Sequence, residues 1–386
     1  MTALLIETSQ ALEAALENAY QEERIALDCE AAGFHRYTDR LCLIQLSTTK
    51  ATILIDPLAF DPAPLLRPIL EDPVSQIVMH GADYDVRLLD RDLNIRLSNL
   101  FDTQVAASLL GEEGLGLASL LERHLGVRLS KKYQKADWAR RPLPQEYQDY
   151  AAGDTKHLHE LADLLGDRLE KARRTSWAKE EFRALESIRW EEQEPEDPVL
   201  RIREAKELSL RQLFALRKAL AWRDEVARDR DRATFRVAPD GALVDVARNL
   251  PGSMEELEEI RGLSRSLVRD SGQDLLAEIQ EVVRAPDTDL TPYPSRSRNG
   301  SRGGGRARLA PDEEERANKL KEARNRQARA LGIDRGTLLP NAVVADVARR
   351  QPDSLETLVQ VPGMKRWQVE AVGEALLKAL PGRKKD

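Results

Sequence analysis

Two carboxylates lie close together in the apolar run "RIALDCE", where Asp28 and Glu30 flank Cys29. Side chains alternate between the two faces of a strand, so the carboxylates point the same way and Cys29 points the other way. Adjacent carboxylates raise each other's pKa unless a cation or a shared proton compensates, and "ALDCEAAG" offers no neighbouring Lys or Arg. An oxygen-only ligand set suits a hard divalent cation.

Further acids and a tyrosine stand where they could complete such a site. Asp85 begins a predicted helix directly after the strand "QIVMH", at the strand end where the site residues of α/β sheets gather. Tyr150 and Asp154 are four residues apart on a predicted helix, so they share a face about 6 Å apart along its axis. Each feature alone is more typical of a helix cap or a solvated surface. Only the ordered combination predicts a site.

The histidines are weaker candidates. His80 ends a strand, where a packed or hydrogen-bonded histidine is more common than a catalytic one. His157 and His159 are two residues apart on a helix and diverge, which argues against a zinc site.

A basic segment, "SKKYQKADWARRPL", interleaves cations with aromatic residues, as surfaces that bind single-stranded nucleic acid do. Trp138 in this segment is equally suited to anchoring the loop to its domain. The substrate-binding candidates from it are Lys132, Arg140 and Arg141.

The predicted elements mix strands and helices over the first 170 or so residues. "RIALDCE", "LCLIQLS", "ATILIDP" and "QIVMHG" have the apolar or alternating pattern of strands. Helical patterns occupy residues 9–20, 83–91, 102–110, 115–124 and a long stretch from about 144. This order predicts an α/β domain built around one sheet.

Composition narrows the class of protein. The 386 residues carry a net charge of −7, with 41% hydrophobic and 32% charged residues, which is typical of a globular chain of several domains. We expect no membrane segment and no signal peptide, because apolar runs are short and the N-terminal stretch has no basic region. With only Cys29 and Cys42 present, two buried thiols in a reducing, cytoplasmic setting are the simplest interpretation, although the sequence leaves a disulfide open.

A duplicated module follows the α/β region. Residues 239–263 align without a gap on residues 340–364, and ten of the 25 positions are identical. Helical patterns predict an all-α module of about 75 residues around each copy. Between the copies, "RAPDTDLTPYPSRSRNGSRGGGRAR" is rich in Pro, Gly, Ser and Arg, which favours a flexible linker, with phosphate contacts as the alternative.

The ordered acids and tyrosine resemble the three motifs of the DEDDy family of 3′→5′ exonucleases. The resemblance extends to "FDTQVAASLLG" and "LASLLERHLGVRLSKKYQKADWARRPLPQEYQDYAAGD", and the two repeats resemble HRDC domains, as in the layout of the ribonuclease D family. It implies a ribonuclease H-like mixed sheet flanked by helices. It further implies that two divalent ions, Mg²⁺ or Mn²⁺, are held by four acids while a tyrosine orients the attacking water. The residues concerned are Asp28, Glu30, Asp85, Asp154 and, for the water, Tyr150.

The resemblance also implies where the domains begin and end and which substrate the protein acts on. We expect an exonuclease domain over 1–170, a helical connector over 171–205, HRDC-like domains over 206–284 and 311–386, and a flexible linker over 285–310. The implied substrate is RNA, with tRNA precursors cut at the 3′ end to nucleoside 5′-monophosphates by a monomeric enzyme.

Two other functions stay open at this point. The same chemistry would serve an exonuclease that acts mainly on DNA, and a nucleic-acid-binding scaffold without catalysis would use the repeats alone. An ATP-driven helicase is excluded more directly, because the chain has no G-x-x-x-x-G-K-[ST] phosphate loop.

Overall fold

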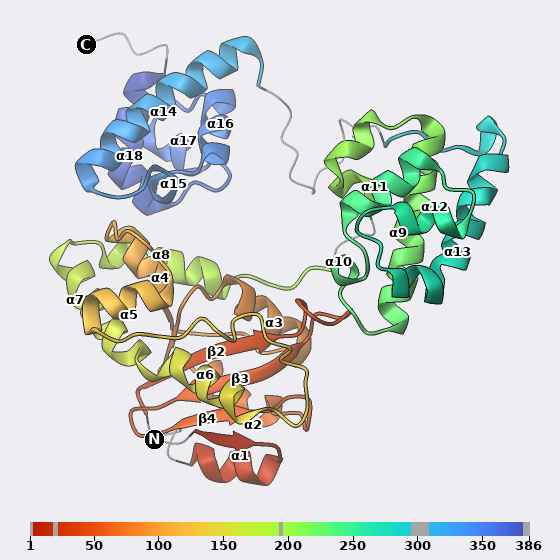
Figure 1. Cartoon of the computed structure of the whole chain (residues 1–386). Helices are drawn as coiled ribbons and strands as arrows, with labels where there is room; N and C mark the ends of the chain where they lie inside the picture. Colours follow the sequence, from red (N-terminus) through yellow and green to blue (C-terminus); the bar gives the residue numbers. More distant parts are fainter. Residues whose placement is uncertain (1–2, 18–21, 193–195, 295–308, 381–386) are drawn as a thin grey trace.

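The computed structural model describes residues 3–17, 22–192, 196–294 and 309–380. An N-terminal α/β unit is followed by two helical modules, one beside it and one packed against its helices α4 and α8 (Figure 1). None of the helices in these ranges has both the length and the apolar character needed to cross a bilayer.

A six-stranded mixed sheet forms the centre of the first unit, in the order β1-β4-β3-β2-β5-β6. Strand β2 pairs antiparallel with β3 and parallel with β5, which confirms the predicted mixed sheet. The strands are β1 (Leu4–Ile6), β2 (Arg24–Ala31), β3 (Leu41–Ser47), β4 (Thr52–Ile55), β5 (Gln76–Met79) and β6 (Leu100–Asp102). The short strands β1 and β6 were not predicted from the sequence.

Helices cover both faces of this sheet. Side chains at alternate strand positions, such as Ile25 and Leu27, form one core with α1 (Ser9–Leu16), α2 (Ala63–Leu70) and α3 (Asp83–Leu93). The opposite face, with Ala26 and Leu43, packs against α6 (Gln145–Lys156), α7 (Leu158–Lys171) and the loop before them. Helices α4 (Thr103–Leu109), α5 (Leu117–Leu125) and α8 (Thr175–Glu186) complete the unit.

The long helix predicted from residue 144 is two helices. The chain leaves helical geometry at His157, between α6 and α7. Apolar periodicity runs through both helices, so the pattern alone did not reveal the break.

The two modules repeat the same five helices at a constant spacing of 101 residues. The first has α9 (Leu210–Asp229), α10 (Thr234–Val237), α11 (Asp240–Asn249), α12 (Met254–Glu259) and α13 (Arg265–Arg284). The second has α14 (Pro311–Leu331), α15 (Arg335–Leu338), α16 (Asn341–Arg350), α17 (Leu355–Val359) and α18 (Arg366–Ala379). Gly262 and Gly363 occupy equivalent bends with φ of +99° and +79°, a conformation that disfavours other residues.

The described parts of the two connecting segments pack on the neighbouring units. In the segment 171–205, α8 packs on the sheet unit through Phe182, and the short 3₁₀ turns η2 (Pro198–Arg201) and η3 (Arg203–Glu207) join the core of the first module. The first part of the predicted linker also holds to this module, because Arg217 donates to the carbonyls of Thr291 and Pro292. Residues 295–308 of that linker lie outside the described residues.

The second module packs directly on the N-terminal unit. The Trp367 ring stacks on that of Trp177 in α8, with centroids 4.9 Å apart, and its indole N–H donates to Glu181 at 2.7 Å. Gly111 meets the second module so closely that a Cβ there would lie 1.7 Å from the carbonyl oxygen of Gly332. This interface therefore combines aromatic stacking with a backbone approach that only glycine permits.

We predict that Trp367→Ala destabilises the second module by about 3–5 kcal/mol, because the indole is 2% exposed and its removal leaves a cavity and takes the indole donor from one oxygen of Glu181. Urea unfolding followed by circular dichroism measures the change. Trp190→Ala is the matched control: that ring is 43% exposed and meets Arg91, so its loss costs about 1 kcal/mol or less. Equal effects of the two substitutions would contradict the assigned interface.

Candidate active site

Strand β2 presents Asp28 and Glu30 on the face that α6 and α7 cover. Cys29, between them, joins the core on the opposite face, as the strand period predicts. The pairing changes register between Glu30 and Ala31, so a bulge ends the regular ladder directly after the second acid. Both cysteines of the chain are free thiols.

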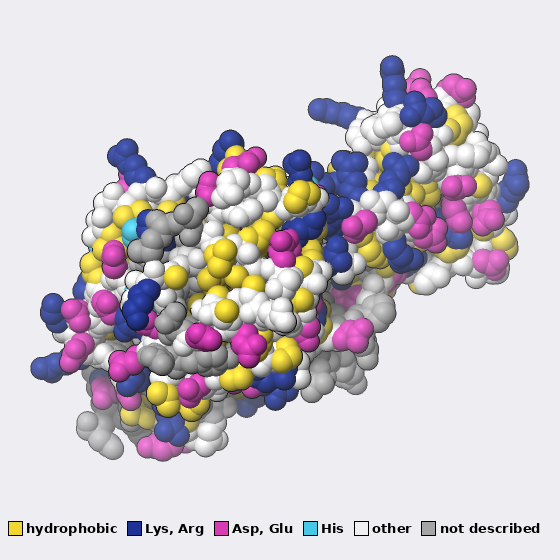
Figure 2. Space-filling model, turned by 90° about the horizontal axis from the view of Figure 1, so that it is seen from below, with side chains coloured by type: hydrophobic (Ala, Val, Ile, Leu, Met, Phe, Trp, Pro, Cys, Tyr) yellow, Lys and Arg dark blue, Asp and Glu magenta, His cyan; other side chains and the backbone are white. Residues whose placement is uncertain are grey.

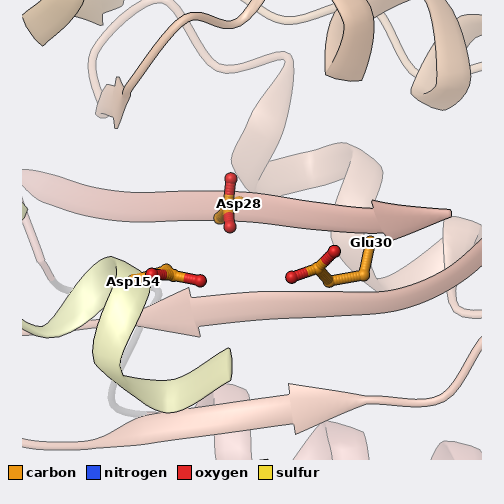
Figure 3. A group of neighbouring side chains, drawn as sticks. All are labelled: Asp28, Glu30 and Asp154. Atoms are coloured by element: carbon orange, nitrogen blue, oxygen red, sulfur yellow. The ribbon is translucent and has the colours of Figure 1, made fainter. Parts of the chain in front are cut away.

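Helix α6 brings Asp154 to this pair. One carboxylate oxygen from each of Asp28, Glu30 and Asp154 lies within 4.8 Å of the others. Figure 3 shows the carboxylates of Asp154 and Glu30 directed toward each other, with Asp28 on the strand between them. A strand and a helix far apart in sequence therefore build one cluster, as the sequence analysis expected of these three acids.

Asp85 lies in the first turn of α3 and is 7% exposed. It is not among the three acids within 4.8 Å, but it is close enough for the charge of Asp28 to raise its pKa, in addition to the larger effect of burial. The turn that leads to it is fixed by Asp102, which accepts from the backbone N–H groups of Gly81 and Ala82 at 3.1 and 2.7 Å. The sequence analysis missed Asp102, because its partners are backbone groups on a neighbouring strand end.

Burial disfavours the charged forms of all four acids, and the charges of neighbouring acids add to this effect at Glu30, Asp85 and Asp154. Burial raises the pKa of Asp28 to about 7, against a lowering hydrogen bond from the Cys29 backbone. Burial, and then the charge of Asp28, raise the pKa of Asp154 to about 8. The pKa of Glu30 is also raised well above its usual range, by burial and the neighbouring acids. Among the described residues, no Lys or Arg forms an ion pair with these carboxylates, so the cluster lacks a compensating charge.

The side chain of Gln45 is a second indication that this site holds a ligand. It is paired with Asp28 across β2 and β3, so both side chains lie on the same face of the sheet. Gln45 is fully buried, and neither its amide nitrogen nor its amide oxygen has a hydrogen-bond partner among the residues that the structure describes. A buried amide that lacks partners beside four uncompensated carboxylates fits a site that holds a hydrated cation. No local pattern pointed to Gln45, which lies in an apolar strand.

Tyr150 stands one helical turn before Asp154, at the edge of an aromatic group. Its ring lies 6.1 Å from that of Tyr133 and 6.0 Å from that of Trp138. Burial, followed by the charges of Asp154, Glu30 and Asp28, raises the pKa of the Tyr150 hydroxyl. The hydroxyl therefore stays protonated at neutral pH and can act as a hydrogen-bond donor.

The basic segment divides into structural and exposed residues. Trp138 is 2% exposed and packs in the core beneath α6, so it anchors the loop. Arg141 donates to both oxygens of the buried Asp56, at 2.5 and 2.7 Å, and to the carbonyl of Cys42. These contacts give Arg141 a structural role, and the RNA contact expected from the sequence stays a prediction. Lys132 and Arg140 are exposed, and the Lys132 ammonium lies 4.7 Å from the centre of the Tyr133 ring.

His80 has the packed role that its position suggested. Its Nδ1 lies 2.9 Å from the Thr103 hydroxyl at the start of α4. The described residues offer no histidine cluster for a metal, because the metal-compatible group is made of carboxylates alone.

Comparison with known proteins places this geometry in a family. Residues 4–170 match a family model described as 3'-5' exonuclease, and residues 211–279 and 313–380 each match the HRDC domain. The chain is 34% identical to ribonuclease D of Cronobacter turicensis over 291 residues, which cover 75% of this chain and 78% of the relative. The chain belongs to the ribonuclease D family.

Solved structures agree with this family assignment. The crystal structure of Escherichia coli RNase D, described as an exoribonuclease involved in structured RNA processing, superposes with a TM-score of 0.67 at 29% identity and covers 98% of both chains. The catalytic core of RRP6 from Trypanosoma brucei gives a TM-score of 0.66 at 30% identity, covering 73% of this chain and 80% of that core. In the ribonuclease D layout, the three-acid cluster lies in the exonuclease region and α9–α18 form the HRDC modules.

We predict that divalent-metal binding to this site depends steeply on pH. Because the pKa of Asp28 is about 7 and that of Asp154 about 8, binding must displace protons below these values. The affinity for Mn²⁺ should rise more than about tenfold between pH 6.5 and 8.5 and then level off. Titration calorimetry in buffers of different ionisation enthalpy measures both the affinity and the protons released. An affinity that does not change over this range would contradict the assigned protonation of the site.

We also predict that Arg141→Ala destabilises the α/β unit by about 3–5 kcal/mol, because Asp56 is 1% exposed and would lose its charged partner. Arg140→Ala, one residue away and exposed, should change stability by about 0.5 kcal/mol or less. Thermal unfolding of both variants tests the difference. If Arg141→Ala were as stable as the wild type, the structural role of this arginine would be wrong.

Proposed function

We propose that this protein is a metal-dependent 3′→5′ exoribonuclease that hydrolyses RNA from its 3′ end and releases nucleoside 5′-monophosphates. The observation that carries the proposal is the cluster of Asp28, Glu30 and Asp154, with Asp85 buried close by and, among the described residues, no cationic side chain paired with them. Membership of the ribonuclease D family supports the reaction class, and the name of the relatives supports RNA as the substrate.

The four acids are suited to hold two divalent ions, Mg²⁺ or Mn²⁺. Such ions, when bound, lower the pKa of a water molecule and neutralise charge on the phosphate. In the proposed arrangement Asp28 would contribute to both ion sites, Glu30 and Asp154 would complete one site, and Asp85 would hold the other ion. Bound cations would lower the raised pKa values of these acids, so metal binding would be accompanied by full ionisation of the cluster.

Tyr150 orients the attacking water in this proposal. Its hydroxyl keeps its proton, because burial and three nearby acids raise its pKa. A protonated phenol donates a hydrogen bond and does not serve as the base, so it fixes the position of the water oxygen before attack on the phosphorus.

For the biological substrate, we infer RNA precursors that need 3′ trimming, with tRNA precursors as the case that the family implies. We further infer a monomer that acts in the cytoplasm and needs no ATP. Discrimination between RNA and DNA depends on contacts with the 2′-hydroxyl group, which distinguishes the two at a given position.

The test is cleavage of a labelled single-stranded RNA and of a DNA of equal sequence, with Mg²⁺ or Mn²⁺. We predict that Asp154→Asn abolishes detectable cleavage and that Tyr150→Phe lowers kcat by about a hundredfold or more, as loss of a positioned donor does. Asp149→Asn is the matched control, because Asp149 is exposed on the same helix and bonds only to Gln145 in the structure.

Each arm of this experiment decides a separate point. Activity retained by Asp154→Asn would overturn the assigned metal site. Faster cleavage of DNA than of RNA would replace the proposed substrate. Tight RNA binding without cleavage under any divalent metal would favour the scaffold function.

A further inference from the structure

The loop after β2, residues 32–40, joins the active site to the first HRDC module; we call it the junction loop. It begins two residues after Glu30. Its backbone is tied to the module, because the N–H of Ala233 donates to the carbonyl of His35 at 3.0 Å and Arg236 donates to that of Phe34 at 2.7 Å. The first HRDC module is therefore held beside the strand that carries the catalytic acids.

Two phenylalanines remain exposed at this junction. Phe34 of the junction loop is 38% exposed and Phe235 of α10 is 50% exposed, and their ring centroids lie 5.5 Å apart. A ring pair that served only to hold the domains together would be expected to bury more of its surface. Exposed aromatic surface of this kind is a mark of a binding site.

Cations surround these rings. The Arg236 guanidinium lies 4.6 Å from the centre of the Phe34 ring and 5.9 Å from that of Phe235, and the Lys135 ammonium lies 5.4 Å from the Phe34 ring. Within the described residues neither Arg236 nor Lys135 forms an ion pair. By contrast, two other arginines of the junction are paired, Arg36 with Asp137 and Arg228 with Asp224. Figure 2 shows Lys and Arg side chains gathered where the first module meets the larger body.

A series of contacts connects this surface with the active site. The Tyr133 ring lies 6.1 Å from that of Tyr150, and the Lys132 ammonium lies over the face of the Tyr133 ring. Lys135 is two residues further along the same loop and reaches the Phe34 ring. Alternating aromatic and cationic side chains thus extend from the proposed catalytic tyrosine to the first HRDC module.

The second HRDC module lacks this feature. At the spacing of 101 residues, Phe235 and Arg236 correspond to Gly336 and Thr337. The end of its first helix instead packs on the α/β unit at Gly111. The sequence therefore distinguishes two copies that share a fold, and only the first carries an aromatic and a cation at this position.

We propose that Phe34, Phe235 and Arg236 form a stacking platform for the bases of the single-stranded RNA segment that precedes the nucleotides held in the active site. The inference rests on the proposed exoribonuclease function and deepens it, because it assigns part of substrate binding to the first HRDC module. Bases stack on the exposed rings, since every base has an aromatic face, and Arg236 and Lys135 meet the phosphates. The RNA would run past Tyr133 to reach Tyr150.

The test uses the full chain and a 12-nucleotide single-stranded RNA with a 5′ fluorescent label. Binding is measured by anisotropy in EDTA, and cleavage is measured with Mg²⁺ against a 5′-phosphorylated RNA dinucleotide. We predict that Phe235→Ala raises the Kd for the 12-nucleotide RNA about tenfold. The ratio of the KM values for the long and the short substrate should rise by a similar factor.

Further variants separate stacking from a structural role. Phe235→Tyr keeps an aromatic face and should bind like the wild type, whereas Phe235→Leu keeps an apolar contact and should behave like Phe235→Ala. Val283→Ala, at a residue 51% exposed on α13, is the control and should change neither measurement. The double variant Phe235→Gly/Arg236→Thr has the residues that the second module carries at these positions. It should bind the 12-nucleotide RNA more weakly than Phe235→Ala does.

The outcomes distinguish this inference from the proposed function. An unchanged Kd and KM ratio in Phe235→Ala would overturn the platform, as would wild-type binding by Phe235→Leu. A fall in kcat on both substrates without a change in the KM ratio would show that Phe235 acts through domain docking, which also overturns it. If the wild type cleaved neither RNA while Phe235→Ala still weakened binding, the exoribonuclease function would fail and the binding platform would stand.

Discussion

The constraint on which this structure depends is the burial of four carboxylates that no Lys or Arg in the described part of the chain balances with an ion pair. Asp28, Glu30 and Asp154 approach within 4.8 Å, and burial raises the pKa of Asp28 to about 7, that of Asp154 to about 8 and that of Glu30 well above its usual range. In a protein without bound metal such an arrangement costs stability above neutral pH, because ionising each acid is opposed by its surroundings. The fold is built to hold it nonetheless. A strand, the helix after a neighbouring strand and a helix over the sheet each supply a part.

Much of this site could be predicted from the sequence because it follows local periods. The strand period placed Asp28 and Glu30 on one face, and the helix period placed Tyr150 beside Asp154. Gln45 and Asp102 escaped prediction because their importance comes from strands paired across the sheet. Arg141 has a structural partner that the sequence analysis missed for a related reason. Its partner, Asp56, is 85 residues away, and no local pattern connects them.

The two duplicated modules share one fold but contact the α/β unit at different places. In both copies the end of the first helix faces the α/β unit: Arg36 pairs with Asp231 in one, and Gly111 meets Gly332, 101 residues later, in the other. The repeat was visible in the sequence, because ten identities in 25 residues exceed what composition gives. The contacts with the α/β unit could not be predicted from the sequence, because they depend on residues outside the repeat. The first module consequently lies beside the strand of the catalytic acids, and the second against α8 and Trp177.

The most direct measurement of the central claim is the thermal midpoint of the wild type and of Asp154→Asn at pH 8.5, in EDTA and with Mn²⁺. The pKa of Asp154 is raised in the folded state, so its contribution to stability is fully present below the ordinary value of 3.8 and is lost as pH rises through about 8. The account therefore predicts that in EDTA the variant melts at a higher temperature than the wild type. With Mn²⁺ the order should reverse, because the ion stabilises the folded wild type that binds it. A variant that melts lower in EDTA, or a wild type that Mn²⁺ does not stabilise, would contradict the account.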